Sequence, residues 1–307
     1  MKILLPNVSL TTLPGQVLHL PNCKITLTSH FLKKIYDKFT VLTDKNGLYV
    51  FDGKAYILKA MFAKNGYYSS YGEIKFNFRT FTYQKGEVFK PDNQLIVVKL
   101  RRKIDPTPMY VQRVDESKVP KFGQDCGYDL LIGDWVKPYG QGKVSDFIIN
   151  CDGFQKPPLK KFGHGTYDFK LTMTFSNPND GIQKIILEKE KKTGFRSLIK
   201  CPFKFIYKAP LTGYQPILKE YTSFDGNTHS RSHNRNANYI FRIRTKTDKK
   251  GNIISALYGK IYGQIEHGKY IQFTYYVNPT PNSRSMEWNR KNVIKKIKGK
   301  NYSPWDY

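Results

Sequence analysis

Residues 238–277 read NYIFRIRTKTDKKGNIISALYGKIYGQIEHGKYIQFTYYV, and this stretch decides the fold class. Apolar and aromatic residues alternate with polar ones, which is the pattern of strands that bury one face. The segment 248–252, Asp-Lys-Lys-Gly-Asn, interrupts the alternation and predicts a tight turn in which Gly251 takes a positive φ. The stretch therefore predicts β-hairpins and an antiparallel β protein.

Similar alternating runs predict further strands upstream. They lie at residues 39–62, 73–83, 94–100, 167–175 and 182–208. Aromatic residues make up 15% of the chain, and large rings suit the pleated surface of a sheet. We therefore expect an all-β protein over most of the chain.

Two short helices are expected near the ends of the chain. In residues 29–39, Ser29 is a suitable N-cap and apolar residues recur at helical spacing. Residues 285–298 are basic, and Val293, Ile294 and Ile297 would share one face of a short helix.

A Pro-rich, polar segment at residues 105–120 predicts a linker, because closely spaced prolines disfavour both a helix and a central strand. We expect an N-terminal β-rich domain in residues 1–104 and a C-terminal sandwich-like domain in residues 121–307. The predicted architecture is two antiparallel, sandwich-like units.

The chain is strongly basic, with 51 Lys and Arg against 24 Asp and Glu and a net charge of +27. One interpretation is a polyanionic partner such as nucleic acid, an acidic glycan or an anionic membrane. The other is a solubilising, Lys-rich surface, which the excess of Lys over Arg favours, since specific phosphate readout relies on Arg. No apolar run approaches the ~18 residues of a membrane span.

The four cysteines, Cys23, Cys126, Cys151 and Cys201, form no CxxC pair, which argues against a zinc ribbon or a thioredoxin-like site. Two disulfides in any of three pairings, or four free thiols, are compatible with their spacing. The N-terminal segment contains no convincing export signal.

No catalytic motif is decisive, and we expect no cofactor. His229 and His233 are four residues apart and would chelate a metal from a helix, although the Ser and Asn around them favour a loop. Asp129, Asp134 and Asp146 lie near aromatic residues, as paired carboxylates do in glycosidases.

Six blocks stand out in the C-terminal part of the chain: GYDLLIGDW (127–135), PYGQGK (138–143), TFSNPNDGI (174–182), NYIFRIRT (238–245), SALYGKIYG (255–263) and FTYYVNPTPN (273–282). As a set they resemble an uncharacterised family of bacterial exported, lipoprotein-like proteins of the planctomycete and verrucomicrobial kind. The resemblance implies export and a β-rich fold, and it implies no activity. The chain departs from the family at Cys23, where small residues do not precede the cysteine of a lipoprotein cleavage site.

We therefore expect a non-enzymatic, extracytoplasmic binding or structural protein that is associated with glycans. Aromatic side chains on loops stack on sugar rings, and the candidates are Trp135, Tyr139, Tyr262 and Trp305. The first alternative is a polyanion- or nucleic-acid-binding protein that uses its Lys-rich surface. The second alternative is a glycan-active hydrolase.

Overall fold

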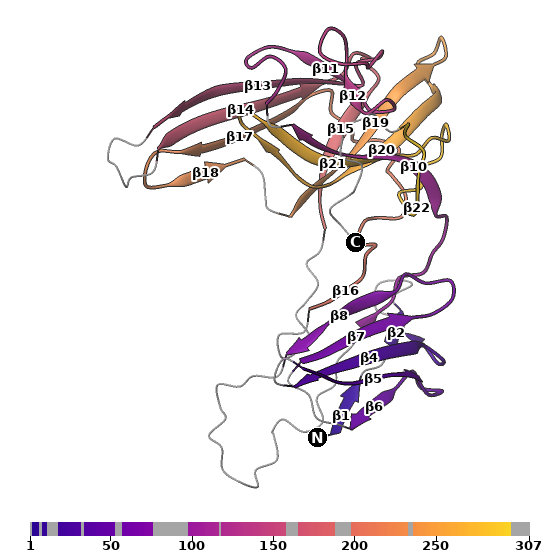
Figure 1. The fold of residues 1–307 in the computed structure, drawn as a ribbon. Coiled ribbons are helices and arrows are strands. Elements are labelled where there is room, and N and C mark those ends of the chain that lie inside the picture. The colour runs from indigo at the N-terminus through magenta and orange to yellow at the C-terminus, as the bar shows by residue number, and fades with distance from the viewer. Residues whose placement is uncertain are drawn as a thin grey trace. The chain divides into compact units, whose positions relative to one another are not determined.

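A computed structural model describes residues 2–5, 8–10, 18–31, 34–52, 57–75, 98–116, 118–157, 165–187, 198–232 and 236–295. The chain divides into two compact units. Unit 1 comprises Met1–Ile104 and Lys189–Lys204, and unit 2 comprises Asp105–Glu188 and Phe205–Tyr307. The chain therefore returns once from unit 2 to unit 1. Over the described ranges every regular element is a β-strand (Figure 1), and no helix is long and apolar enough to cross a membrane.

Unit 2 contains two six-stranded sheets. The first has the order β15 (Gly181–Ile186), β19 (Ala237–Thr247), β20 (Ile253–His267), β21 (Ile271–Val277), β10 (Thr107–Glu116) and β22 (Trp288–Asn292). The second has the order β12 (Asp134–Trp135), β11 (Cys126–Asp129), β13 (Phe147–Lys156), β14 (Thr166–Thr174), β17 (Leu218–Phe224) and β18 (His229–Arg231). Neighbouring strands are antiparallel except β10 and β22, which pair in parallel.

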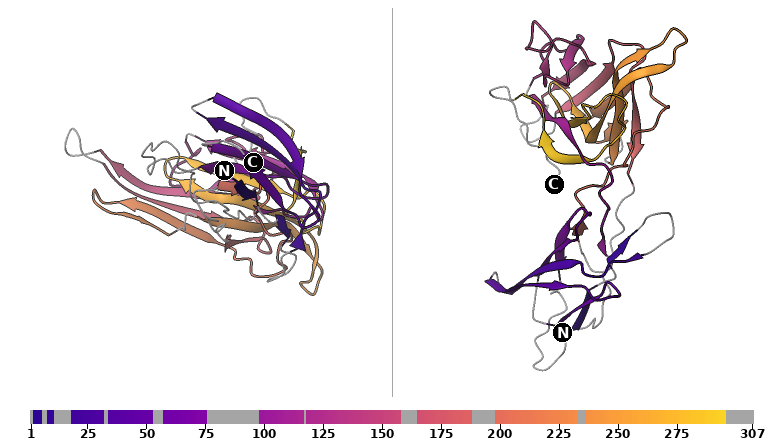
Figure 2. Two further views of the ribbon diagram at one scale, coloured as in Figure 1. Left: turned by 90° about the horizontal axis from the view of Figure 1, so that it is seen from below. Right: turned by 90° about the vertical axis from the view of Figure 1, so that its right-hand side faces the viewer.

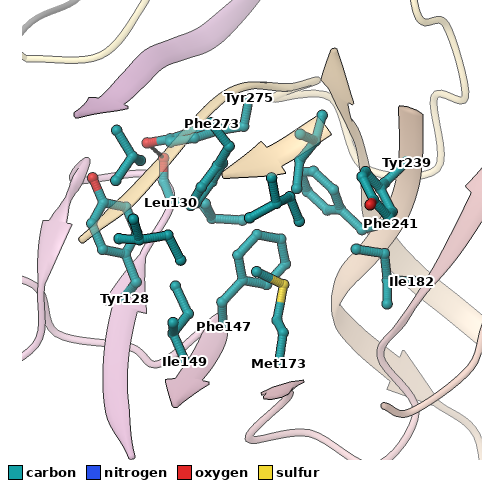
Figure 3. Packing of buried hydrophobic residues seen from close by; sticks show 14 of the residues in the cluster. Tyr128, Leu130, Phe147, Ile149, Met173, Ile182, Tyr239, Phe241, Phe273 and Tyr275 are labelled. Carbon is teal, nitrogen blue, oxygen red and sulfur yellow. Dashed lines mark hydrogen bonds between the residues drawn. The ribbon is translucent and has the colours of Figure 1, made fainter. Parts of the chain in front are cut away.

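The core of unit 2 lies between these sheets, and aromatic rings from both sheets fill it (Figure 3). Phe147 of β13 meets Phe241 of β19 edge-on, with ring centroids 5.0 Å apart. Tyr128 of β11 meets Tyr275 of β21 in the same way at 6.4 Å. All four side chains are fully buried, and burial of each contributes roughly 1.5–3 kcal/mol to folding. The expected sandwich is present in this unit.

The hairpin between β19 and β20 has the predicted turn. Gly251 has a φ of +83°, and its N–H donates to the Asp248 carbonyl at 3.1 Å. The Asp248 carboxylate accepts the N–H groups of Lys250 and Asn252, each at 2.8 Å. The predicted positive φ of Gly251 is thereby confirmed.

Unit 1 has a five-stranded sheet in the order β16 (Leu198–Lys200), β8 (Ser70–Lys75), β7 (Ile57–Ala63), β4 (Lys24–Phe31) and β5 (Lys34–Leu42). Two small sheets accompany it: β1 (Lys2–Leu5) with β6 (Tyr49–Asp52), and β3 (Leu18–His19) with β2 (Val8–Leu10) and β9 (Val98–Lys99). Its core includes Ile25, Leu27, Leu58 and Phe62, all fully buried.

Both helix predictions are wrong over the described residues. Residues 29–39 span the end of β4 and most of β5, which pair with each other as a hairpin. Periodicity alone does not separate a short apolar helix from a strand, and pairing with β4 decides it here. In the segment 285–298, residues Trp288–Asn292 form β22 beside β10, and residues 296–298 lie outside the described residues.

The predicted linker at residues 105–120 is also wrong, because residues 107–116 form β10. This strand lies between β21 and β22, and its Val111 and Val114 are fully buried. The ladder to β21 begins at Tyr110, after Pro108, so the missing N–H of the proline removes no bond from that ladder.

All four cysteines are buried free thiols, and no disulfide joins them. Burial raises the pKa of the Cys23 thiol to about 11 and that of the Cys151 thiol to about 12. The structure thus selects free thiols among the alternatives that the spacing leaves open.

Candidate ligand-binding face

The second sheet of unit 2 extends further than the sheet that covers it. The free ends of β13, β14, β17 and β18 run out past the strands of the opposing sheet (Figure 1; Figure 2). In β14, Leu171 and Met173 point into the core and are at most 1% exposed. Because side chains alternate along a strand, Phe169 and Tyr167 lie on the same inner face, nearer the free end.

Aromatic side chains cross this inner face from strand to strand. The register pairs Tyr167 with Phe224 of β17 and Phe224 with His229 of β18. The Tyr167 ring stacks on Phe169 at 5.7 Å between centroids, and the His229 ring stacks on Phe224 at 4.2 Å. We call Phe169, Tyr167, Phe224 and His229 the aromatic row.

The aromatic row is layered in depth. Phe169 and Phe224 are 8% and 7% exposed, whereas Tyr167 is half-buried and His229 is exposed. The Tyr167 hydroxyl and His229 Nδ1 are 3.2 Å apart and hydrogen-bonded, which holds the two outer rings in place. Tyr270, from the turn between β20 and β21, is 41% exposed. Tyr270 lies close to the row, because a Cβ placed on Gly268 would be 3.4 Å from the Phe169 ring and 3.5 Å from the Tyr270 ring. Burial raises the pKa of the Tyr270 hydroxyl.

Polar side chains border the aromatic row on the same face. Gln155 is the register partner of Tyr167, and Arg231 is the register partner of Thr222, which in turn pairs with Phe169. Gln155 and Arg231 are both exposed. The face therefore combines ring surface with amide and guanidinium donors.

A buried carboxylate closes the core side of this face. Glu220 of β17 is 3% exposed and accepts the Tyr239 hydroxyl at 3.0 Å and Lys184 Nζ at 2.7 Å. The Ser232 hydroxyl also donates to it. Burial acts to raise the pKa of Glu220, but the hydrogen bonds of Lys184 and Ser232 outweigh it and hold the pKa below its usual value. These bonds tie β17 to β15 and β19 and so fix the base of the aromatic row.

A second polar cluster lies at the other end of the strands, where β13 begins. Arg244 of β19 donates from Nε to Asp146 at 2.8 Å and from Nη2 to Asp129 at 2.9 Å. Its backbone N–H donates to Asp180 at 2.8 Å, and its φ is +52°, a value that side chains other than Gly adopt at a cost. We call Asp129, Asp146, Asp180 and Arg244 the loop clamp.

The three predicted carboxylates are buried: Asp129 and Asp146 belong to the loop clamp, and Asp134 accepts the Gln141 N–H at 2.9 Å. Asp129, Asp134 and Asp146 are 1%, 5% and 2% exposed. Asp129 accepts four backbone N–H groups at 3.0–3.1 Å, from Leu131, Ile132, Lys143 and Val144. Burial raises the pKa of Asp146 against the opposing effect of Arg244. The arrangement stabilises loops and leaves these oxygens no open side for a substrate.

The structure does not bring the sequence-predicted aromatic residues together. Trp135 is 3% exposed and packs edge-on against Tyr128 at 5.1 Å, so its prediction as a stacking residue is wrong. Tyr139 is 44% exposed in the loop after β12. Tyr262 is half-buried on β20, in the other sheet, and Trp305 lies outside the described residues.

The predicted metal site has no support in the described ranges. His229 lies on a strand and stacks on Phe224, and His233 is outside the described residues. Among the described residues, no group of three or more His, Cys, Asp or Glu side chains is arranged to hold a metal ion. The sequence singled out His229, but it placed Tyr167, Phe169 and Phe224 only as strand or loop residues.

No family model matches the chain, and neither the curated proteins nor the solved structures include a match. The resemblance to exported bacterial proteins therefore stays a prediction, and the function has to be argued from the geometry.

Proposed function

We propose that this protein is a non-enzymatic, extracytoplasmic binding protein that holds a glycan against the aromatic row. The proposal is carried by the inner face of β13, β14, β17 and β18 beyond the opposing sheet, where Tyr167 and His229 are the accessible rings of the aromatic row and a polar border flanks them (Figure 1). Apolar faces of sugar rings pack on aromatic rings, while amide and guanidinium groups donate to their hydroxyls.

The dimensions of the face favour an oligosaccharide. Gln155, Tyr167, Phe224 and His229 are register partners across four strands, and a step between strands is ~4.8 Å. The row of partners is therefore about 14 Å long. Because the hydrogen bonds of Tyr167 and Glu220 hold the strands and rings in position, little ordering is required when the ligand binds.

The state of the carboxylates favours binding over hydrolysis. A glycosidase needs an acid and a base that face the scissile bond. Here Asp129 and Asp146 are bound to Arg244 and to loop backbone, at the end of the strands away from the aromatic row. Glu220 is engaged by Lys184, Ser232 and Tyr239.

Export belongs to the same proposal, and the six blocks that resemble exported proteins support it. Sequencing the N-terminus of the protein from its native host, together with cell fractionation, tests it. A protein that retains Met1 in the cytoplasmic fraction would contradict export.

Binding is tested by titrating the full chain on an array of neutral oligosaccharides. Tyr167→Ala should weaken binding of the best oligosaccharide about tenfold, since it removes one stacking ring. The matched control is Phe154→Ala, which removes a 48% exposed ring from β13 on the opposite face of the same sheet. Binding that both variants weaken equally, or an array without any bound oligosaccharide, would contradict the proposal.

A further inference from the structure

The basic charge of the chain is concentrated in unit 1. Its residues include 23 Lys and Arg against 7 Asp and Glu, whereas unit 2 has 28 against 17. Unit 1 is the shorter unit, so its excess positive charge per residue is more than twice that of unit 2. Seven carboxylates cannot neutralise 23 cations, so unit 1 has an excess of 16 positive charges, which favours a polyanionic partner.

One basic segment of unit 1 is held rigidly. Residues 99–103 read Lys-Leu-Arg-Arg-Lys, and Leu100 anchors them in the core at 2% exposed. Backbone bonds fix the segment against the turn before β8: Tyr68 N–H donates to the Arg101 carbonyl, and Lys103 N–H donates to the Gly66 carbonyl, each at 2.8 Å. Short Lys- and Arg-rich runs of this kind form patches for nucleic acid or heparin.

Two rings order the cations of this segment. Phe203 and Tyr68 are stacked, with centroids 5.0 Å apart and planes at 25°. The Arg101 guanidinium lies 4.6 Å from the Phe203 centroid, and Lys103 Nζ lies 5.6 Å from the Tyr68 centroid. We call these four residues the cation–ring stack. It positions two cations at one site before any ligand arrives, which lowers the entropy lost on binding.

We propose that unit 1 binds an acidic polysaccharide, a sulfated or carboxylated chain, at the cation–ring stack and the adjacent Arg102 and Lys204. Single-stranded nucleic acid is the competing polyanion, and its binding relies on bases that stack on aromatic rings. Here each ring is already engaged by the other ring and by a cation.

The experiment measures binding of heparin, poly-dT and neutral dextran to the full chain at several salt concentrations. The variant Arg102→Ser/Lys103→Ser/Lys204→Ser removes three charges from the site. The control variant Lys137→Ser/Lys249→Ser/Lys250→Ser removes three exposed charges from unit 2. Heparin should bind the wild-type chain and the control alike, and the slope of log affinity against log salt should fall by about two to three in the site variant.

Three outcomes would overturn the proposal. An equal loss of heparin affinity in both triple variants would show that the charge acts diffusely. Tighter binding of poly-dT than of heparin would assign the site to nucleic acid. A wild-type chain that does not bind heparin at low salt would have no polysaccharide site. If the site variant does not fold, as judged by circular dichroism, Arg102→Glu alone gives the same comparison against Lys249→Glu. Tyr167→Ala should leave heparin binding unchanged, which separates this site from the glycan site proposed in unit 2.

Discussion

Replacement of Arg244 by Met should destabilise unit 2 strongly. The side chains are close in volume, but Met removes the charge that lies 2.8 Å from Asp146 and 2.9 Å from Asp129. Removal of one partner from a buried ion pair costs about 3–5 kcal/mol, because a charge stays buried without compensation. We expect the lower end, about 3 kcal/mol, since Asp129 keeps its backbone N–H donors.

The loss should depend on pH. Burial already raises the pKa of Asp146 in the folded protein, and removal of Arg244 should raise it further. A carboxyl group whose pKa is raised by folding stabilises the folded protein fully at pH values below its unfolded pKa. This stabilisation is lost as the pH rises through the folded pKa. The stability gap between wild type and Arg244→Met should therefore be largest at neutral pH and should shrink as pH falls towards about 4.

Urea unfolding of both proteins at pH 7 and at about pH 4.5 measures this gap. The matched control is Lys246→Met, an exposed residue two positions along β19, which should change stability by less than about 0.5 kcal/mol. A loss under about 1 kcal/mol for Arg244→Met, or an equal loss at both pH values, would refute the role of the loop clamp.

Three further predictions concern the turn, the thiols and the corrected strand. Gly251→Val should destabilise the protein by on the order of 1–2 kcal/mol in a urea melt, and Asn252→Val by less, because the φ of +83° at Gly251 disfavours a β-branched residue. A Cβ added at Gly251 would meet no atom within 4 Å, so the backbone alone causes the loss. Equal stability of wild type and Gly251→Val would contradict this prediction. Native Cys151 should resist iodoacetamide at pH 8, since burial raises its pKa to about 12, and it should react after unfolding; fast labelling of the folded chain would contradict this. Limited proteolysis should spare residues 107–116, and early cleavage there would show that β10 is not held in its sheet.

The sequence predicted the sheet class because the alternation between Tyr239 and Val277 reports which side chains are buried. Local chemistry was also sufficient at Gly251, where the turn requires a positive φ. At residues 29–39 it was insufficient, because a short apolar run has the pattern of a helix as well as of a strand, and only the pairing of β5 with β4 decides between them. Pro106 and Pro108 predict a linker, but β10 tolerates them because its ladder to β21 starts at Tyr110.

The candidate site was harder to predict for a topological reason. The alternation places Tyr167 and Phe169 on a core-facing side, and nothing in residues 166–174 indicates that the opposing sheet ends before them. Phe224 and His229 join them only through the pairing of β14, β17 and β18. Trp135 illustrates the converse, because a ring beside acidic residues in the sequence can fill the core.

Glycan binding at the aromatic row is tested by an NMR titration of the histidine ring signals. The oligosaccharide that binds best on the array is added to the full chain, with the His229 signal assigned by His229→Gln. We predict that the His229 ring signal shifts in a saturable way, because its ring is exposed and stacked on Phe224, whereas that of His267, which is 4% exposed in the other sheet, stays in place. An unchanged His229 signal at saturating oligosaccharide would show that the glycan does not bind at the aromatic row.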